Sequence, residues 1–434
     1  MMPGRTPRVG LITFGCRLNQ YETQMMRERL EPACEVVDRA ADIYLINACT
    51  VTALAERKAR QVVHRLRRRE PQARIVVVGC LADAVTQGLS RMEGPDLFIG
   101  NAAKPHIGAV VRRLLDDSPA GPKEEPLGSL DRETVTGHLG HVRAFLKVQD
   151  GCDRVCSFCR TTQVRGRSRS KSVAIAVSEA RGLIAAGHPE IVLTGINLAQ
   201  YAAPDGGLPE LVRALLEIPE LRRLRLGSIN ASGLTAPLIA VFAEDPRACA
   251  HFHVPLQSGD DDVLRAMRRA TTVAGYRERV ETVRRHLPRA TFGADLIVGF
   301  PGEDEAAFER TCRLVEEIGF ANLHVFRYSP RAGTQAAGLP HRVPEADKRF
   351  RAQRLEEICE RVQKRVFGEW IGRADRVLVE TIHDAVASGY SRGYLPVQLR
   401  ADDTTEPGHE TAIRFTRIVG QHLEGVKDDR QEHG

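Results

Sequence analysis

The chain has 434 residues, of which 42% are hydrophobic and 27% are charged, a composition that is ordinary for a folded globular protein and excludes wholesale disorder. At roughly 150 residues per domain, this length predicts about three domains. The 62 Lys and Arg residues exceed the 56 Asp and Glu residues by only +6, which identifies no partner. There is no apolar run long enough for a membrane span and no signal-peptide pattern at the start. We therefore expect a cytoplasmic protein whose ten cysteines are reduced.

The first part of the chain alternates short apolar runs with helical patterns. The apolar, β-branched runs lie at residues 8–15, 42–48 and 74–79, and the alternation predicts βαβ units around a parallel sheet. The pattern fades near residue 115, so we expect an N-terminal domain over residues 1–115. The next stretch, 116–140, is rich in Pro, Gly and charge and is typical of a linker.

A second series of strand-like runs begins after the linker. Six runs with amphipathic segments between them predict a partial β/α barrel over residues 141–368, short of the eight units of a full barrel. The runs are 142–148, 190–195, 221–228, 250–256, 291–299 and 322–329. A basic helix over about 344–367 ends this domain. Residues 369–434 carry alternating strand patterns and predict a small all-β module, so the fold class is α/β with a β appendage.

A loop after the first strand of the second series carries three closely spaced cysteines. Cys152, Cys156 and Cys159 lie in the segment GCDRVCSFC, so one loop can wrap three thiolates around one centre. A cubane of four irons normally takes four cysteine ligands, and three leave one iron open to a small molecule. Structural zinc is an alternative, but it needs four ligands and no second CxxC pair or nearby histidine is present. Ordinary core thiols are a third alternative, which the Gly-, Asp- and Arg-containing loop disfavours.

Another set of cysteines is spread over the N-terminal domain. Cys16, Cys49 and Cys80 each lie at the carboxyl end of one of the three predicted strands, where ligands of open parallel sheets bind. They predict a second centre, again with an iron left open, although three buried cysteines at strand ends remain an alternative. The other four cysteines show no ligand spacing and are expected to be core residues: Cys34, Cys249, Cys312 and Cys359.

The CxxxCxxC loop, with an aromatic residue before its last cysteine, resembles the signature of radical S-adenosylmethionine (SAM) enzymes. Combined with the N-terminal cysteines, the pattern is similar to the methylthiotransferases, which join a cluster domain, a radical SAM partial barrel and a TRAM module. The resemblance covers nearly the whole chain. Three segments look most like the branch that acts on N6-threonylcarbamoyladenosine in tRNA: FGCRLNQYET (14–23), NACTVT (47–52) and GRSRS (166–170).

This resemblance implies two 4Fe–4S clusters and SAM as cofactors. The Cys152, Cys156 and Cys159 cluster would bind SAM through its open iron, and the N-terminal cluster would carry the sulfur. A SAM-derived radical would remove hydrogen, and a methylthio group would be inserted at C2 of N6-threonylcarbamoyladenosine at tRNA position 37. The implied partners are tRNA, an electron donor of the flavodoxin or ferredoxin type, and a sulfur source. Phe158 in the cysteine loop is a candidate contact of the SAM adenine, and five residues at or near strand ends are further candidate SAM contacts: Gly195, Asn197, Ser228, Gln257 and Asp295.

A polynucleotide substrate needs cations along its backbone. Residues 54–70 hold seven Lys and Arg residues against two Glu, with Thr52 as the expected N-cap of a helix that begins just after Cys49. Residues 160–171 contain five cations and no acid. A solvated helix face is the alternative for the first stretch. The predicted substrate contacts are Arg57, Lys58, Arg165, Arg167 and Arg169.

The C-terminal module is net acidic, whereas a small RNA-binding barrel is expected to be basic. Residues 371–434 contain eight Lys and Arg but eleven Asp and Glu. Either a few arginines form a local patch or this module binds RNA weakly, and Tyr390 and Tyr394 would either stack on bases or belong to the core. Alternatives to the tRNA enzyme are methylthiolation of another tRNA adenosine or of a ribosomal-protein side chain, and a non-catalytic iron–sulfur RNA-binding protein. An electron carrier would usually complete the fourth ligand.

Overall fold

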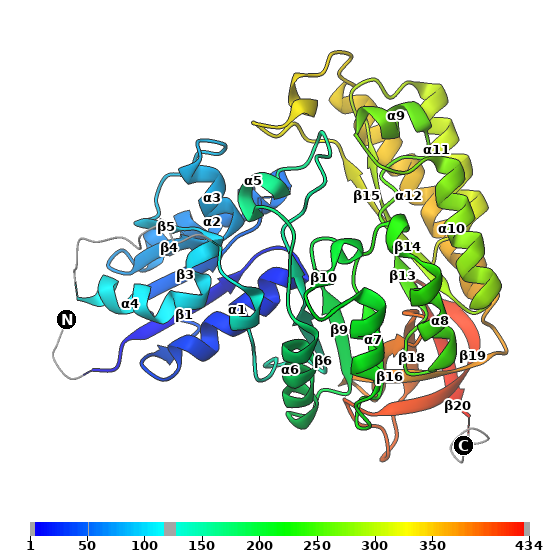
Figure 1. Cartoon of the computed structure of the whole chain (residues 1–434), viewed down its shortest axis with the longest axis horizontal. Helices are drawn as coiled ribbons and strands as arrows, with labels where there is room; N and C mark the ends of the chain where they lie inside the picture. The colour runs from blue at the N-terminus through cyan, green and yellow to red at the C-terminus, as the bar shows by residue number, and fades with distance from the viewer. Residues whose placement is uncertain (1–4, 51, 117–126, 429–434) are drawn as a thin grey trace.

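The computed structural model describes residues 5–50, 52–116 and 127–428 of the chain. Its first unit is a parallel five-stranded sheet in the order β2-β1-β3-β4-β5 (Figure 1). The strands are β1 (Arg8–Thr13), β2 (Glu35–Val36), β3 (Ile43–Asn47), β4 (Arg74–Val78) and β5 (Leu97–Ile99). The three predicted strands are present. The sequence missed β2 and β5 because two or three residues are too few to show a period.

Helices cover both faces of this sheet. One face is packed by α1 (Arg17–Leu30) and α4 (Ile107–Leu115), whose Met26, Leu30 and Val111 meet the strand residues of one apolar cluster. The other face is packed by α2 (Ala53–Arg69) and α3 (Cys80–Thr86). The sequence pattern of α2 explains its orientation, because Ala59, Val62, Val63 and Leu66 recur every three or four positions and pack in the apolar cluster against the sheet.

The central unit is an open barrel of six parallel strands in chain order. Two three-stranded sheets, β12-β9-β6 and β13-β14-β15, are joined by bridges from Leu224 to Ala248 and from Ser228 to His253. The strands are β6 (Arg143–Lys147), β9 (Glu190–Thr194), β12 (Arg223–Leu226), β13 (His251–His253), β14 (Thr291–Val298) and β15 (Asn322–Arg327). The expected partial (β/α)6 barrel is confirmed.

An outer layer of helices surrounds these strands (Figure 1). It comprises α6 (Val173–Ala185), α7 (Leu208–Leu216), α8 (Ala236–Glu244), α10 (Val273–His286), α11 (Glu305–Ile318) and α12 (Glu345–Gly368). Two short helices, α5 (Thr161–Arg165) and α9 (Asp261–Ala266), lie in the loops. Within the described part of the chain, no helix has both the length and the apolar character needed to cross a membrane.

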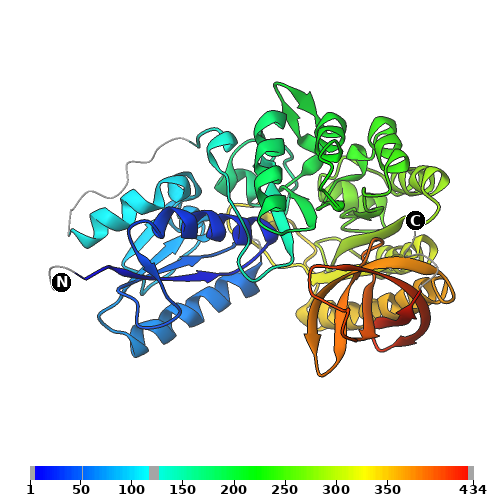
Figure 2. The ribbon, with the colours of Figure 1, turned by 90° about the horizontal axis from the view of Figure 1, so that it is seen from below.

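The C-terminal unit is a closed five-stranded barrel in the order β16-β17-β18-β20-β19. Its strands are β16 (Ala374–His383), β17 (Val386–Ser391), β18 (Pro396–Arg400), β19 (Glu410–Val419) and β20 (His422–Lys427). In Figure 2 this barrel, drawn orange to red, lies beside α12 and the central strands. Its interior residues, such as Val377 and Phe415, belong to the same apolar cluster as the central barrel.

Part of the expected linker is packed in place. Residues 117–126 lie outside the described residues, but Leu130 is buried, and Val135 is buried in the central apolar cluster. Nearby, the carboxylate of Glu133 lies 2.7 Å from the ammonium of Lys147. The composition of this stretch is that of a linker, yet three of its side chains are held by the units that it joins.

The C-terminal barrel is attached to the central one by buried arginines. Arg223 donates to the carbonyls of Arg376 and Tyr390, and Arg225 to those of Ser391 and Arg392. Both guanidiniums also contact the carboxylate of Glu190, which is fully buried. Burial alone would raise the pKa of Glu190, but Arg225 and then Arg223 and Arg143 lower it to about 2. Glu190 therefore carries the negative charge that makes these buried arginines tolerable.

Replacing Glu190→Gln should destabilise the protein strongly, because two buried guanidiniums would lose their shared counter-charge. We expect a loss of about 3–5 kcal/mol, measured as a lower urea midpoint and easier proteolysis of the C-terminal barrel. Glu217→Gln, at an exposed position after α7, is the control and should change stability by less than about 0.5 kcal/mol. Equal midpoints for the two variants would contradict this role.

Candidate active site

The three N-terminal cysteines converge at the carboxyl edge of the first sheet. Cys16 is the N-cap of α1, Cys49 follows β3, and Cys80 begins α3 after β4. Gly15 has φ +117°, and a Cβ there would lie 2.5 Å from the Cβ of Cys49, so glycine lets these two turns approach. Cys16 is also among the groups whose charge acts on the Cys80 thiol. Adjacent thiols at one edge of the sheet fit a cluster with three cysteine ligands.

The second trio lies on a loop that is closed at its base. Gln149 and Asp150 form β7, which pairs with β8 (Arg169–Ser170), and the cysteines lie between these strands. The backbone N–H of Arg154 donates to Cys152 Sγ and that of Thr161 donates to Cys159 Sγ, each at 3.4 Å. Burial raises the pKa of the Cys152 and Cys159 thiols, while these N–H groups lower it. Free sulfurs that already accept hydrogen bonds fit a cluster held as thiolates.

The short helix α5 connects the two trios. It begins two residues after Cys159, and its last residue, Arg165, donates from Nε to Cys80 Sγ at 3.1 Å. The amide of Asn101 donates both to Cys80 Sγ, at 3.6 Å, and to the carbonyl of Val164 in α5. A single turn of helix thus fixes the position of one cysteine set relative to the other.

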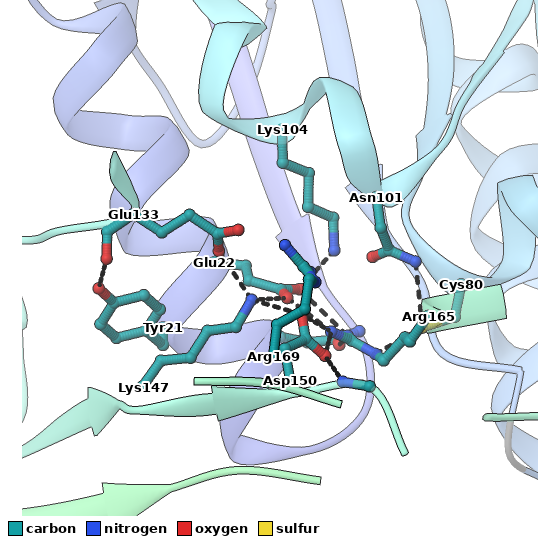
Figure 3. A network of polar contacts seen from close by, with 12 residues as sticks. Tyr21, Glu22, Cys80, Asn101, Lys104, Glu133, Lys147, Asp150, Arg165 and Arg169 are labelled. Atoms are coloured by element: carbon teal, nitrogen blue, oxygen red, sulfur yellow. Dashed lines mark hydrogen bonds and ion pairs between the residues drawn. The ribbon is translucent and has the colours of Figure 1, made fainter. Parts of the chain in front are cut away.

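A buried group of charged residues surrounds this connection (Figure 3). Arg165 lies 2.7 Å from the carboxylate of Glu22 and 3.0 Å from that of Asp150. Lys147 lies within 2.9 Å of the same two carboxylates, and Lys104 pairs with Glu22. We call this group the junction cluster; its members are Glu22, Lys104, Glu133, Lys147, Asp150, Arg165 and Arg169.

The junction cluster contains one more cation than carboxylates, because four basic residues face three acidic ones. A Cys80 thiolate beside Arg165 would balance the remaining charge. Burial raises the pKa of the Cys80 thiol above its usual value, and the opposing effect of Arg165 and Lys104 offsets this rise only in part. Burial would also raise the pKa of Asp150, but Arg165 and Lys147 lower it to about 2. The cluster is therefore electrostatically suited to a negatively charged sulfur ligand at Cys80.

A cavity of about 640 Å³ lies where the three units meet. Its wall includes Cys16 from the N-terminal unit together with three of the predicted SAM contacts, Gly195, Ser228 and Asp295. Gly195 and Ser228 follow the carboxyl ends of β9 and β12, where barrel enzymes bind ligands, and Asp295 lies inside β14. The structure thus brings one N-terminal cysteine and the central strand ends to the same cavity.

The other predicted SAM contacts do not line the cavity. Among the described residues, the buried amide of Asn197 has no hydrogen-bond partner other than the Cys152 sulfur, whose pKa it lowers. Phe158 packs against an apolar cluster that includes Phe300, and Gln257 has φ +78°. A buried amide next to the cysteines fits a polar ligand such as the amino acid part of SAM.

Three residues of the cavity region were not predicted as a group. His253 lies 3.1 Å from the carboxylate of Asp295, and the donor atoms of these residues and His324 are within 4.8 Å of one another. They come from β13, β14 and β15, three neighbouring strands. A polar wall results, opposite the two tyrosines of the C-terminal barrel that also line the cavity, Tyr390 and Tyr394.

The predicted RNA contacts fall into two groups. Arg57, Lys58 and Arg167 are exposed and available to a polynucleotide. Arg169 is partly exposed and lies 3.5 Å from Asp150. Arg165 is buried in the junction cluster, and this location favours a role in positioning Cys80 over direct contact with substrate.

Sequence reasoning missed most of the junction cluster. Lys147 had a detectable signal, because a lysine inside the apolar run AFLKV has to be paired if the strand is buried. Glu22 and Lys104 gave none, since each lies in a helical segment where charged residues are ordinary. Glu22 and Lys104 join one cluster with Lys147 only once α1 has packed against β6.

Comparison with known proteins agrees with this geometry. Residues 8–100 match a family described as "Uncharacterized protein family UPF0004", and residues 146–315 match the radical SAM superfamily. The threonylcarbamoyladenosine tRNA methylthiotransferase MtaB of Thermotoga maritima is 36% identical over 89% of this chain and 90% of its own length. The protein of the same name from Bacillus subtilis is 30% identical over 98% of each chain.

Solved structures support the fold. The radical SAM methyltransferase TsrM of Kitasatospora setae superposes with a TM-score of 0.57 at 13% identity, covering 77% of each chain. The cobalamin-dependent radical SAM enzyme OxsB superposes with a TM-score of 0.53 at 12% identity, covering 82% of this chain and 56% of its own. The chain belongs to the radical SAM methylthiotransferases, in the threonylcarbamoyladenosine tRNA methylthiotransferase family. As a radical SAM enzyme, it uses SAM and a 4Fe–4S cluster.

Replacing Arg165→Gln should weaken metal held by the N-terminal cysteines, because it removes the positive charge and the N–H donor beside Cys80 Sγ. Loss of a group that contacts a metal ligand typically costs 10–100-fold in metal affinity, roughly the effect expected here. Iron retention under a chelator and an EPR redox titration measure it, with a more negative midpoint potential expected. Arg169→Gln, which also removes a cation near Asp150 but touches no sulfur, is the control. Equal iron retention in Arg165→Gln and Arg169→Gln would refute the role of Arg165 beside Cys80.

Proposed function

We propose that this enzyme inserts a methylthio group at C2 of N6-threonylcarbamoyladenosine at tRNA position 37, in the cytoplasm where tRNA is modified. The observation that carries the proposal is the presence of two separate trios of cysteines, linked by α5, with Cys16 of the N-terminal trio on a cavity that residues of the barrel strands also line. Its relatives carry the name of this activity.

Cys152, Cys156 and Cys159 would hold the cluster that binds SAM, and Cys16, Cys49 and Cys80 would hold a second, auxiliary 4Fe–4S cluster. When bound, these groups supply a SAM-derived radical that can remove hydrogen from an unactivated carbon, and the sulfur that replaces it. The chain supplies placement: Gly195, Ser228 and Asp295 line the space for SAM and base, and Asn197 offers its buried amide near Cys152.

Each trio leaves a cluster with an incomplete ligand set, so each has one iron free for a reactant. Cys16 is exposed and lines the cavity, whereas Cys49 and Cys80 are buried, and this supports an auxiliary site within reach of a base bound in the cavity. This asymmetry supports delivery of sulfur from the N-terminal side. An electron donor of the flavodoxin or ferredoxin type and a sulfur source complete the proposal.

The proposal is tested in cells that lack the gene, by mass spectrometry of tRNA nucleosides. We expect the methylthio derivative of N6-threonylcarbamoyladenosine to disappear and to return when the wild-type gene is restored. An unchanged amount would eliminate the proposed substrate, and loss of a methylthio group from a ribosomal protein or another adenosine would identify an alternative one.

Variants expressed in the strain that lacks the gene distinguish the roles of the two cysteine trios. Cys156→Ala and Cys49→Ala should each lose the methylthio product and about half of roughly eight irons per chain. Only Cys156→Ala should also lose reductive SAM cleavage, measured as 5′-deoxyadenosine from anaerobically prepared protein. Cys359→Ser, on α12 and outside both trios, is the control and should keep its iron and product. Continued product formation by Cys49→Ala would refute the role of the N-terminal trio.

Charge reversal at Arg167 should weaken tRNA binding, because this exposed cation follows the cysteine loop. If Arg167 contacts one phosphate, Arg167→Glu should lower affinity for all sequences alike and reduce the slope of log affinity against log salt by about 1. Filter binding or fluorescence anisotropy at several salt concentrations measures this slope. Arg285→Glu, in the last turn of α10 at the opposite edge of the barrel, should leave it unchanged; an unchanged slope for Arg167→Glu as well would exclude the contact.

A further inference from the structure

The cavity contains one arginine that has no acidic partner. Arg17 follows Cys16 at the start of α1, and both residues line the cavity. Within the described residues, its guanidinium contacts the Tyr394 hydroxyl at 3.0 Å and lies near the Tyr394 and Phe145 rings, but no carboxylate lies within ion-pair distance. Such a guanidinium can take an anion from a ligand.

The neighbouring arginines are already paired. Arg225 pairs with Glu190 at 2.7 Å, and Arg143 pairs with Glu380. Their guanidiniums lie 4.9 Å and 5.4 Å from the centre of the Tyr394 ring. Among these three arginines, Arg17 is the cation that is left for a ligand.

Tyr394 is held rigidly toward Arg17. It has φ +59°, a conformation that costs energy for a bulky residue and persists where packing enforces it. Its ring stacks on Tyr390 at 4.6 Å and lies 4.9 Å from the ring of His251. Burial raises the pKa of Tyr394, but Arg17, Arg143 and Arg225 outweigh it and lower the pKa below its usual value. The cationic surroundings that lower this pKa would equally stabilise a bound anion.

The anion that fits is a carboxylate. A guanidinium binds a carboxylate through two parallel N–H···O bonds, and a phenol hydroxyl adds a third donor. On the proposed function, the N6 substituent of the substrate ends in the carboxylate of its threonine. We propose that Arg17 and Tyr394 bind this carboxylate and so distinguish N6-threonylcarbamoyladenosine from adenosines whose N6 substituent is apolar.

Recognition of the substituent by Arg17 would also position the base within the cavity. Arg17 is bonded in sequence to Cys16, and the same cavity is lined by Ser228 after β12 and by Asp295 within β14. Anchoring the substituent at Arg17 therefore keeps the base in the cavity between the N-terminal trio and the barrel. An apolar substituent would desolvate Arg17 without supplying an anion, which disfavours it.

The test compares two anticodon stem-loop RNAs that differ at one group. One contains N6-threonylcarbamoyladenosine, and the other carries threoninamide in place of threonine, so that the carboxylate becomes a neutral amide of similar size. The iron-loaded wild-type enzyme should bind the carboxylate RNA about 10–100-fold more tightly than the amide RNA. Arg17→Gln should bind both RNAs alike, and Arg17→Lys should keep part of the preference.

Two further measurements make the result decisive. Fluorescence anisotropy gives the affinities, and methylthio product formation should show the Arg17→Gln effect mainly in KM. Tyr394→Phe, which keeps the ring stack and removes only the hydroxyl, should lose part of the preference and carries the test if Arg17→Gln fails to load iron. Iron content and circular dichroism establish that each variant is folded.

The outcomes separate this proposal from the proposed function. If wild type modifies both RNAs with equal KM, carboxylate recognition is wrong and the function stands. If wild type modifies neither, the function itself is wrong. If Arg17→Gln weakens both RNAs by the same factor, Arg17 binds a backbone phosphate and the proposal is overturned.

Discussion

The paired charges of Arg165 are the interaction on which the arrangement of this enzyme depends. The residue lies at the end of a five-residue helix, too short to be stable alone. Its position comes from Glu22 and Asp150, which belong to two different units and share one guanidinium. Removing one partner would leave the others buried and unpaired, so the two units are coupled. This coupling also fixes the position of one cysteine trio relative to the other, because α5 begins next to Cys159 and ends at Arg165, which contacts Cys80.

A second set of buried charges ties the C-terminal barrel to the same cavity. Glu190 holds Arg223 and Arg225, and these arginines donate to backbone carbonyls of the C-terminal barrel, including that of Tyr390. The tyrosines that line the cavity are thereby placed by residues of β9 and β12, and the cavity is complete only when all three units are docked. Its contents can then be recognised by residues from the two ends of the chain, Arg17 and Tyr394.

The sequence predicted the elements and the cysteines well because both leave local signals. Alternating apolar runs marked every long strand of the central barrel, and the spacing of Cys152, Cys156 and Cys159 marked one centre. Pairings between distant residues left no such signal: Arg165 looked like one cation among five in a basic stretch, and only its burial against Glu22 and Cys80 shows a different role. The cavity was equally invisible, since Arg17 and Tyr394 are 377 positions apart.

The acidity of the C-terminal barrel also follows from docking. Glu380 pairs with Arg143 and Glu410 with Arg223, so two of its carboxylates neutralise arginines of the central barrel. The net charge of the C-terminal segment alone therefore differs from the charge that a ligand meets, because two of its carboxylates are paired with arginines at an internal interface. Exposed cations are found instead on α2 and after the cysteine loop, while the C-terminal barrel contributes two tyrosines to the cavity wall. Recognition of the modified base and of the RNA backbone can in this way rest on different units of one chain.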